Sequence, residues 1–109
     1  MKVKRYSIYW VDLNPVVGSE ISKIRPAVVV SDDLMNTHLQ TVVVCPLTTK
    51  LHPAWRSRII INCAGKPSEI AVDQIRTVSK IRLKQEVDQL NQTEAEQLRK
   101  LIVEMYGMA

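Results

Sequence analysis

The chain has 109 residues, of which 46% are hydrophobic and 24% are charged, and its formal net charge is +4. This length suits a single domain over residues 1–109, and the hydrophobic content excludes an intrinsically disordered protein. No apolar run approaches the roughly 18 residues that cross a bilayer. The basic N-terminus has no apolar segment behind it, so no secretory signal is visible. We therefore expect a cytoplasmic protein without a membrane contact.

Positive charge is concentrated in the first part of the chain. Residues 1–84 contain 13 Lys or Arg and 6 Asp or Glu, a net charge of +7. Residues 85–109 contain 2 Lys or Arg and 5 Asp or Glu, a net charge of −3. This distribution favours a polyanionic partner that contacts the first part of the chain.

Five segments rich in Val, Ile, Tyr or Trp predict strands, and Pro, Gly or Asn lie in the gaps between them. Pro46 cannot donate a hydrogen bond to a neighbouring strand, which predicts an exposed edge or a bulge in the third segment. Residues 32–36 and 79–83 are each expected to form one short helical turn. The predicted strands are Ser7–Leu13, Pro26–Ser31, Thr41–Leu47, Arg58–Asn62 and Glu69–Val78.

The C-terminal segment has the pattern of an amphipathic helix. Thr93 and Glu96 fit a capping box, and Gly107 offers a C-terminal stop. Between them an apolar stripe predicts a face that covers a sheet or a partner. Its members are Leu98, Leu101, Ile102 and Met105. The whole pattern predicts a mainly β protein with a C-terminal helix, built as a small, partly open antiparallel barrel; SH3-like and OB-fold barrels both fit.

Two of the predicted strands suggest a site at one rim of the sheet. Arg25 immediately precedes the second predicted strand, and Thr48 immediately follows the third. If these strands pair as antiparallel neighbours, the start of one meets the end of the other, and opposed residues lie about 4.5–5.5 Å apart at Cβ. A guanidinium beside a hydroxyl suits the binding of a phosphate group.

Five motifs follow one another along the chain: Val11-Asp12-Leu13-Asn14-Pro15, Gly18-Ser19-Glu20, Arg25-Pro26-Ala27-Val28-Val29-Val30-Ser31, Pro46-Leu47-Thr48 and Asp73-Gln74-Ile75-Arg76-Thr77-Val78. In this order and at this spacing they resemble the MazF/PemK toxins of bacterial toxin–antitoxin pairs. The resemblance covers most of the chain, although Tyr6-Ser7 stands where many members have Gly-Asp. It implies an SH3-like barrel that assembles as a homodimer.

The resemblance also implies an activity. It predicts a sequence-specific, metal-independent endoribonuclease, an mRNA interferase that cleaves single-stranded RNA through the ribose 2′-OH and arrests growth. A cognate antitoxin with an acidic, extended segment is the implied inhibitor. The implied catalytic residues are Arg25 and Thr48, and the implied substrate-binding residues are Gly18, Ser19, Glu20 and Gln74.

For several polar or aromatic residues the sequence allows more than one role. Glu20 could act as a general base, orient the substrate or cap its loop. Gln74, inside a predicted apolar strand, needs hydrogen-bond partners and could hold Arg25 or the loop, or contact a base. His38 and His52 are expected to be exposed loop residues. Trp55 lies in a loop between Pro53 and Arg56 and is a candidate for stacking on an unpaired base.

Other classes of function compete with this one. Cys45 and Cys63 fit no metal or redox spacing and are expected to be reduced, packed thiols, and neither a metal nor a cofactor is predicted. A toxin of the same fold that poisons DNA gyrase by protein contact is the alternative. Such proteins use an aromatic C-terminus, which residues 106–109 resemble weakly, but they have no need of Arg25 and Thr48. A plain SH3-like interaction module is a third possibility, disfavoured by the basic charge.

Overall fold

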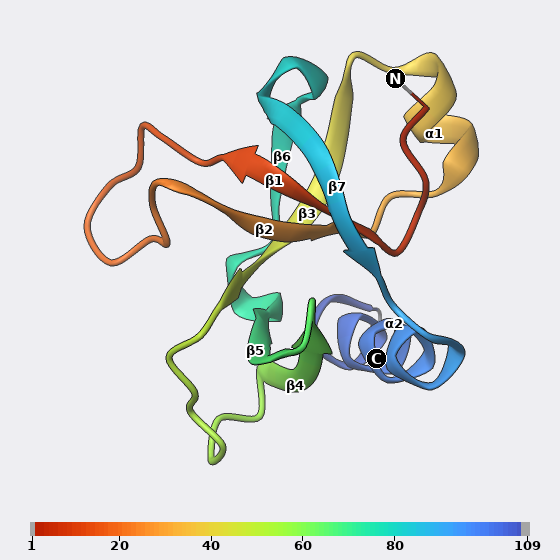
Figure 1. Ribbon diagram of the computed structural model, residues 1–109. Helices are drawn as coiled ribbons and strands as arrows, with labels where there is room; N and C mark the ends of the chain where they lie inside the picture. The colour runs from red at the N-terminus through yellow and green to blue at the C-terminus, as the bar shows by residue number, and fades with distance from the viewer. Residues whose placement is uncertain (1, 108–109) are drawn as a thin grey trace.

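The chain folds into a curled antiparallel sheet, with its longest helix packed beside β4 and the turn η1 (Figure 1). The structure is a computed structural model that describes residues 2–107. In chain order the elements are β1 (Ser7–Asp12), β2 (Ile24–Val29), α1 (Asp33–His38), β3 (Thr41–Thr48), β4 (Arg58–Cys63), β5 (Lys66–Ala71), the 3₁₀ turn η1 (Val72–Gln74), β6 (Arg76–Ser79), the 3₁₀ turn η2 (Lys80–Arg82), β7 (Leu83–Gln89) and α2 (Gln92–Tyr106).

Strand β3 lies inside the sheet and changes partners along its length. The strand order is β4-β5-β3-β2-β1-β7, and β6 pairs with the first half of β3. β3 pairs with β2 as far as Pro46, which lies opposite Ala27, and from Leu47 it pairs with β5. Of the exposed edge or bulge predicted at Pro46, the exposed edge is wrong, because β3 lies inside the sheet and Pro46 pairs with Ala27. Its missing N–H coincides with the point where β3 leaves β2.

The first four predicted strands are present, with ends shifted by at most two residues. The fifth prediction, Glu69–Val78, is wrong as a single strand, because η1 separates β5 from β6. Val72 and Ile75 pack in the core on this turn. The sequence therefore stays apolar across the turn and gives no sign that the strand ends there. β7 was not predicted, since its residues are mostly polar and only Leu83 is fully buried.

Both helices begin at side-chain caps. The turn expected at 32–36 is α1, where Asp32 accepts the Met35 N–H at 2.8 Å. α2 begins earlier than predicted: Asn91 accepts the Glu94 N–H and the Glu94 carboxylate accepts the Asn91 N–H. The predicted box at Thr93 has the same spacing, but Asn91 lies where the chain leaves β7 and can satisfy the first free amides. Gly107 does end the helix, donating to Val103.

Apolar side chains form two clusters on opposite sides of β2. Val28 and Val30 belong to one cluster, which α2 covers through Leu98, whereas Ala27 and Val29 belong to the other. The thiols of Cys45 and Cys63 are free and buried in the first cluster, as predicted. Burial raises the pKa of the Cys45 thiol to about 12, and the nearby negative charge of Asp73 adds to the shift. Over residues 2–107, no helix is long and apolar enough to cross a membrane.

Candidate functional site

Arg25 lies near the start of β2, half-buried, at the open end of the β2–β3 pair. Its Nε donates to the Ser22 carbonyl at 2.9 Å, which fixes the side chain and leaves the remaining guanidinium donors available. Among the residues that the structure describes, no carboxylate lies within 4 Å of this guanidinium. The Arg25 charge is therefore available to an anion from outside the chain.

Thr48 ends β3 at the same end of this strand pair. β2 and β3 pair antiparallel as predicted, and their last pair is Ala27 with Pro46. Two residues further along each strand are Arg25 and Thr48, so both belong to one rim and one face. The cross-strand partner of Thr48 is Glu69 of β5, because β3 has by then left β2. Its hydroxyl accepts the Lys50 N–H at 3.1 Å.

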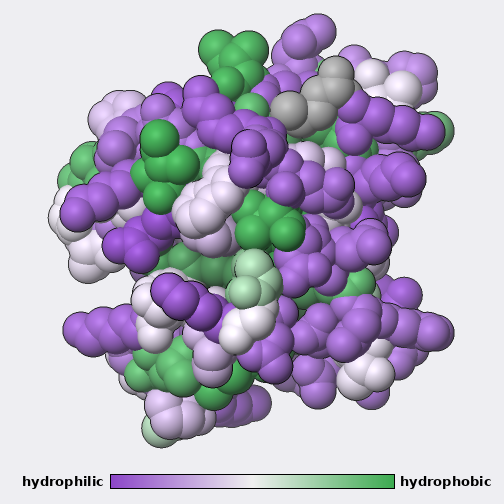
Figure 2. Space-filling view, in the orientation of Figure 1, coloured by the Kyte–Doolittle hydropathy of each residue, from purple (hydrophilic) through white to green (hydrophobic). Residues whose placement is uncertain are grey.

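A hollow of about 360 Å³ lies beside Arg25, between β1–β2 and the β4–β5 turn. In Figure 2 a furrow with apolar colour at its floor runs across the molecule. Three of the side chains that line the hollow are cationic, and none of its described lining residues is acidic. Thr49 lines the hollow, whereas Thr48 does not. A larger hollow of about 480 Å³, between β4 and α2, contains neither Arg25 nor Thr48. The lining of the first is Trp10, Lys23, Ile24, Arg25, Pro26, Thr49, Cys63, Ala64, Lys66, Ser68 and Val87.

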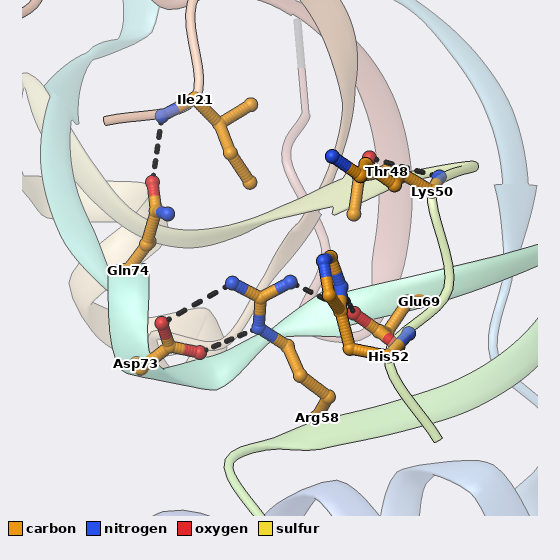
Figure 3. Close-up of polar contacts among 8 residues, drawn as sticks. All are labelled: Ile21, Thr48, Lys50, His52, Arg58, Glu69, Asp73 and Gln74. Carbon is orange, nitrogen blue, oxygen red and sulfur yellow. Dashed lines mark hydrogen bonds and ion pairs between the residues drawn. The ribbon is translucent and has the colours of Figure 1, made fainter. Parts of the chain in front are cut away.

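The loop before Arg25 is held by the predicted substrate-binding residues themselves. Glu20 accepts the Val17 N–H at 2.6 Å and closes a turn in which Gly18 has φ 61° and Ser19 is exposed. Of the three roles left open for Glu20, the geometry supports capping of the loop. Gln74 is in η1 and not inside a strand, and its Oε1 accepts the Ile21 N–H at 2.7 Å (Figure 3). Gln74 therefore holds the loop and not Arg25.

Two further arginines bind the same loop at its base. Arg76 donates to the Leu13 carbonyl at 3.1 Å. Arg82 donates to the carbonyls of Asp12, at 3.2 Å, and of Asn14. Both donate from Nη1, at the end of the guanidinium, whereas Arg25 contacts its carbonyl through Nε.

A buried carboxylate network, absent from the sequence predictions, lies beneath the β3–β4 connection (Figure 3). Glu69 of β5 is fully buried and accepts from the His52 backbone N–H, from His52 Nδ1 at 3.0 Å and from Arg58 Nη1 at 2.8 Å. Arg58 Nε also donates to Asp73 Oδ1 at 2.7 Å. His52 is therefore not the exposed loop residue that was expected, whereas His38 is exposed at the end of α1.

Hydrogen bonds keep the side chains of this network charged although they are buried. Burial on its own raises the pKa of Glu69, but the hydrogen bonds from His52 and Arg58 outweigh it, so the pKa lies below the ordinary value. The same balance, with Arg58 as the donor, lowers the pKa of Asp73. Burial lowers the pKa of Arg58, but the hydrogen bonds and charges of Asp73 and Glu69 raise it by more, so the net shift is upward. All three groups stay ionised at neutral pH.

Acid should destabilise the protein through Glu69 and Asp73. Since both carboxyls have folded-state pKa values below their ordinary ones, the unfolded chain binds protons first as the pH falls. Their contribution is complete at neutral pH and is lost as the pH falls below about 4. We expect the free energy of unfolding, measured with urea, to fall there more steeply than in Glu69→Gln. Glu96→Gln, which removes one partner of an exposed 3.8 Å pair, is the control. Equal slopes in wild type and Glu69→Gln would contradict this expectation.

A small open barrel that presents an unpaired arginine beside a cationic hollow is suited to a protein that binds a polyanion. The comparisons with known proteins agree with that class. A family model described as PemK-like, MazF-like toxin of type II toxin-antitoxin system matches residues 4–106. The chain is 34% identical over 96 residues to Endoribonuclease EndoA of Bacillus subtilis strain 168, covering 84% of this chain and 83% of that protein.

Further relatives and solved structures extend this similarity. Endoribonuclease MazF of Staphylococcus saprophyticus is 34% identical over 97 residues, covering 82% of this chain and 78% of that one. The fold matches MazF from Deinococcus radiodurans with a TM-score of 0.87, 18% identity and 99% coverage of both chains. A mycobacterial endoribonuclease solved with its cognate antitoxin matches with a TM-score of 0.82, 18% identity and coverage of 98% and 97%. The chain therefore belongs to the PemK/MazF family of type II toxins, and the predicted fold is confirmed.

Proposed function

We propose that this protein is the endoribonuclease toxin of a toxin–antitoxin pair, and that it cleaves single-stranded mRNA at specific sequences in the cytoplasm. The observation that carries the proposal is the half-buried Arg25, which pairs with no carboxylate of residues 2–107 and lies beside a hollow whose described charged lining residues are all cationic. The names of the two curated relatives, both endoribonucleases, support the same activity. They also favour it over the gyrase-poisoning alternative.

The C-terminal segment gives that alternative little further support. The Tyr106 hydroxyl donates to the Val72 carbonyl at 2.8 Å, so this aromatic residue already has a structural partner. Residues 108 and 109 lie outside the described residues.

The chemistry needs little from the protein beyond charge and position. The ribose 2′-OH is an internal nucleophile next to the scissile phosphorus, so the enzyme has to align it and stabilise the charge of the phosphorane-like transition state. In this proposal Arg25 donates to the equatorial phosphate oxygens, and it stays charged at any physiological pH. The Thr48 hydroxyl donates to another oxygen.

The loop that Gly18, Ser19 and Glu20 form is proposed to contact the RNA strand. Glu20 and Gln74 hold this loop in place, and Gly18 and Ser19 offer small side chains and backbone N–H groups at its exposed surface. Single-stranded RNA is the physically reasonable substrate, because its unpaired bases expose the edges that a loop can contact. We assign specificity to this loop and catalysis to the rim behind it.

A homodimer and a cognate antitoxin complete the proposal. An acidic, extended antitoxin segment would match the cationic hollow in the way that RNA does. A small barrel whose sheet ends at β4 and β7 has strand edges to cover and gains buried area by pairing, and cyclic dimers are the commonest assembly. We expect light scattering at micromolar concentration to give twice the chain mass of 12.4 kDa. A monomer mass there would contradict the dimer.

The experiment that tests the function is direct. Purified protein is incubated with a long RNA in EDTA, and the cut positions are mapped by primer extension. We expect a small set of cuts that share a short sequence, and the purified Arg25→Ala protein is the control for a contaminating nuclease. No cleavage of any RNA, or cuts without a shared sequence, would contradict the proposal.

A further inference from the structure

Trp55 lies on the β3–β4 connection, residues 49–57, and its side chain is held against two others although 49% of the residue is exposed. Its ring stacks on the His52 imidazole with centroids 3.9 Å apart and planes 20° apart. The Arg58 guanidinium carbon lies 4.7 Å from the centroid of the Trp55 ring. An exposed loop tryptophan normally samples several rotamers; this one has a fixed support.

Both supports of the Trp55 ring are fixed by the same buried carboxylate. Glu69 bonds the backbone N–H and the ring of His52, and it also bonds Arg58. Arg58 is further held by Asp73, and its side chain is only 5% exposed. The position of the indole is therefore set in the free protein, so a ligand that stacks on it loses little affinity to ordering it.

The chemistry of the connection favours a nucleobase as that ligand. Residues 49–57 contain the cations Lys50 and Arg56 and no carboxylate. The connection also begins directly after Thr48, so a strand held at the rim would pass close to it. Every base has a π-face, and stacking on an aromatic side chain tolerates any sequence.

We propose that Trp55 stacks on one unpaired base of the RNA substrate, close to the scissile phosphate, and that Glu69 is the positioning residue for this platform. The proposal rests on the proposed function, because it names a binding subsite for the same RNA. It assigns the buried Glu69 network to substrate binding through His52 and Trp55, and not to the chemical step.

The first test measures binding without cleavage. An RNA oligonucleotide with a 2′-deoxy sugar at the mapped cut site is titrated with wild type, Trp55→Ala and Trp55→Phe, and the Kd is read from fluorescence anisotropy. We expect Trp55→Ala to bind about fivefold to a hundredfold more weakly, the range that one stacked base supplies, and Trp55→Phe to recover most of the loss. Leu51→Ala, an exposed apolar residue of the same connection, is the matched control and should bind as wild type does.

The second test locates the base. Single abasic nucleotides are placed along the oligonucleotide, and a double-mutant cycle is measured with Trp55→Ala at each position. One position near the cut should show no additional loss in the variant, because the partner of the ring is already missing. On cleavable RNA, Trp55→Ala and Glu69→Gln should both raise KM and leave kcat within a fewfold, which a loss of the catalytic rim would not do.

The outcomes separate the two proposals. Wild type that cuts no RNA would overturn the proposed function, and the stacking proposal with it. Wild type that cuts RNA while Trp55→Ala binds the oligonucleotide within twofold of it would overturn only the stacking proposal. A Trp55→Ala protein that binds the antitoxin more weakly but the RNA normally would overturn it as well. If Glu69→Gln does not fold, the Trp55 variants and the abasic series still decide the question.

Discussion

Replacing Arg25 or Thr48 by alanine should lower the rate of RNA cleavage by roughly 10²–10³, the usual cost of removing one donor to a transition-state oxyanion. Arg25 is held by a single bond to the Ser22 carbonyl and pairs with no described carboxylate, so its loss leaves no buried charge unpaired. Both variants should therefore keep the fold, as shown by circular dichroism. Single-turnover cleavage of an oligonucleotide that contains the mapped site gives the rate.

The controls for this pair come from the same chain. Arg99→Ala removes an exposed cation of α2, and Thr41→Ala removes an exposed hydroxyl at the far end of β3. Both should cleave at the wild-type rate. Thr49→Ala belongs beside them, because Thr49 and not Thr48 lines the hollow next to Arg25. A larger loss in Thr49→Ala than in Thr48→Ala would move the catalytic hydroxyl by one residue. Folded Arg25→Ala that cuts within a fewfold of wild type would remove the rim from catalysis.

A single 2′-deoxy sugar on the 5′ side of the scissile bond should block cleavage. Arg25 and Thr48 can stabilise charge on a phosphorane, but neither side chain generates a hydroxide at neutral pH. The nucleophile then has to come from the substrate, and RNA carries a 2′-OH beside each phosphate. The products should have a 2′,3′-cyclic phosphate and a 5′-hydroxyl, and EDTA should leave the rate unchanged.

Deoxy substitution several nucleotides from the cut site is the control, and it should reduce the rate only modestly. Mass spectrometry of the products identifies the termini. If the deoxy-substituted site is cut efficiently, or if EDTA abolishes activity and Mg²⁺ restores it, water is the attacking group. That result would leave Arg25 as a binding residue and rule out attack by the 2′-OH.

The sequence predicted the strands whose apolar composition indicates that they are buried. Continuous Val runs mark β2 and β3, because both faces of these strands pack in a core. β7 lies at the edge of the sheet with mostly exposed side chains, so nothing in its composition distinguishes it from a loop. The bend at η1 was hidden for the opposite reason, since Val72 and Ile75 stay apolar through it.

The candidate site also has one part that the sequence could predict and another that it could not. The rim with Arg25 and Thr48 was predictable because the pairing of two adjacent strands follows from their order in the chain. The switch of β3 to β5 at Leu47 was not, since it depends on where the sheet curls. The Glu69 network joins residues up to 17 apart in sequence, and spacing rules do not apply at that range. One signal was present: Glu69 begins a predicted strand whose next residues are apolar, and a glutamate buried there has to find a cation.

The loop between β1 and β2 is bonded to the rest of the barrel at several separate points: at Ile21 by Gln74, at Leu13 by Arg76, and at its base by Arg82. A loop restrained in this way loses its conformational entropy when the protein folds and not when RNA arrives. In the proposed RNA complex the loop presents a surface of fixed shape to the strand, which would exclude a wrong sequence by misfit and would not adjust to it. Selectivity at this surface should therefore change little with temperature, whereas a loop that ordered on binding would lose affinity steeply on warming.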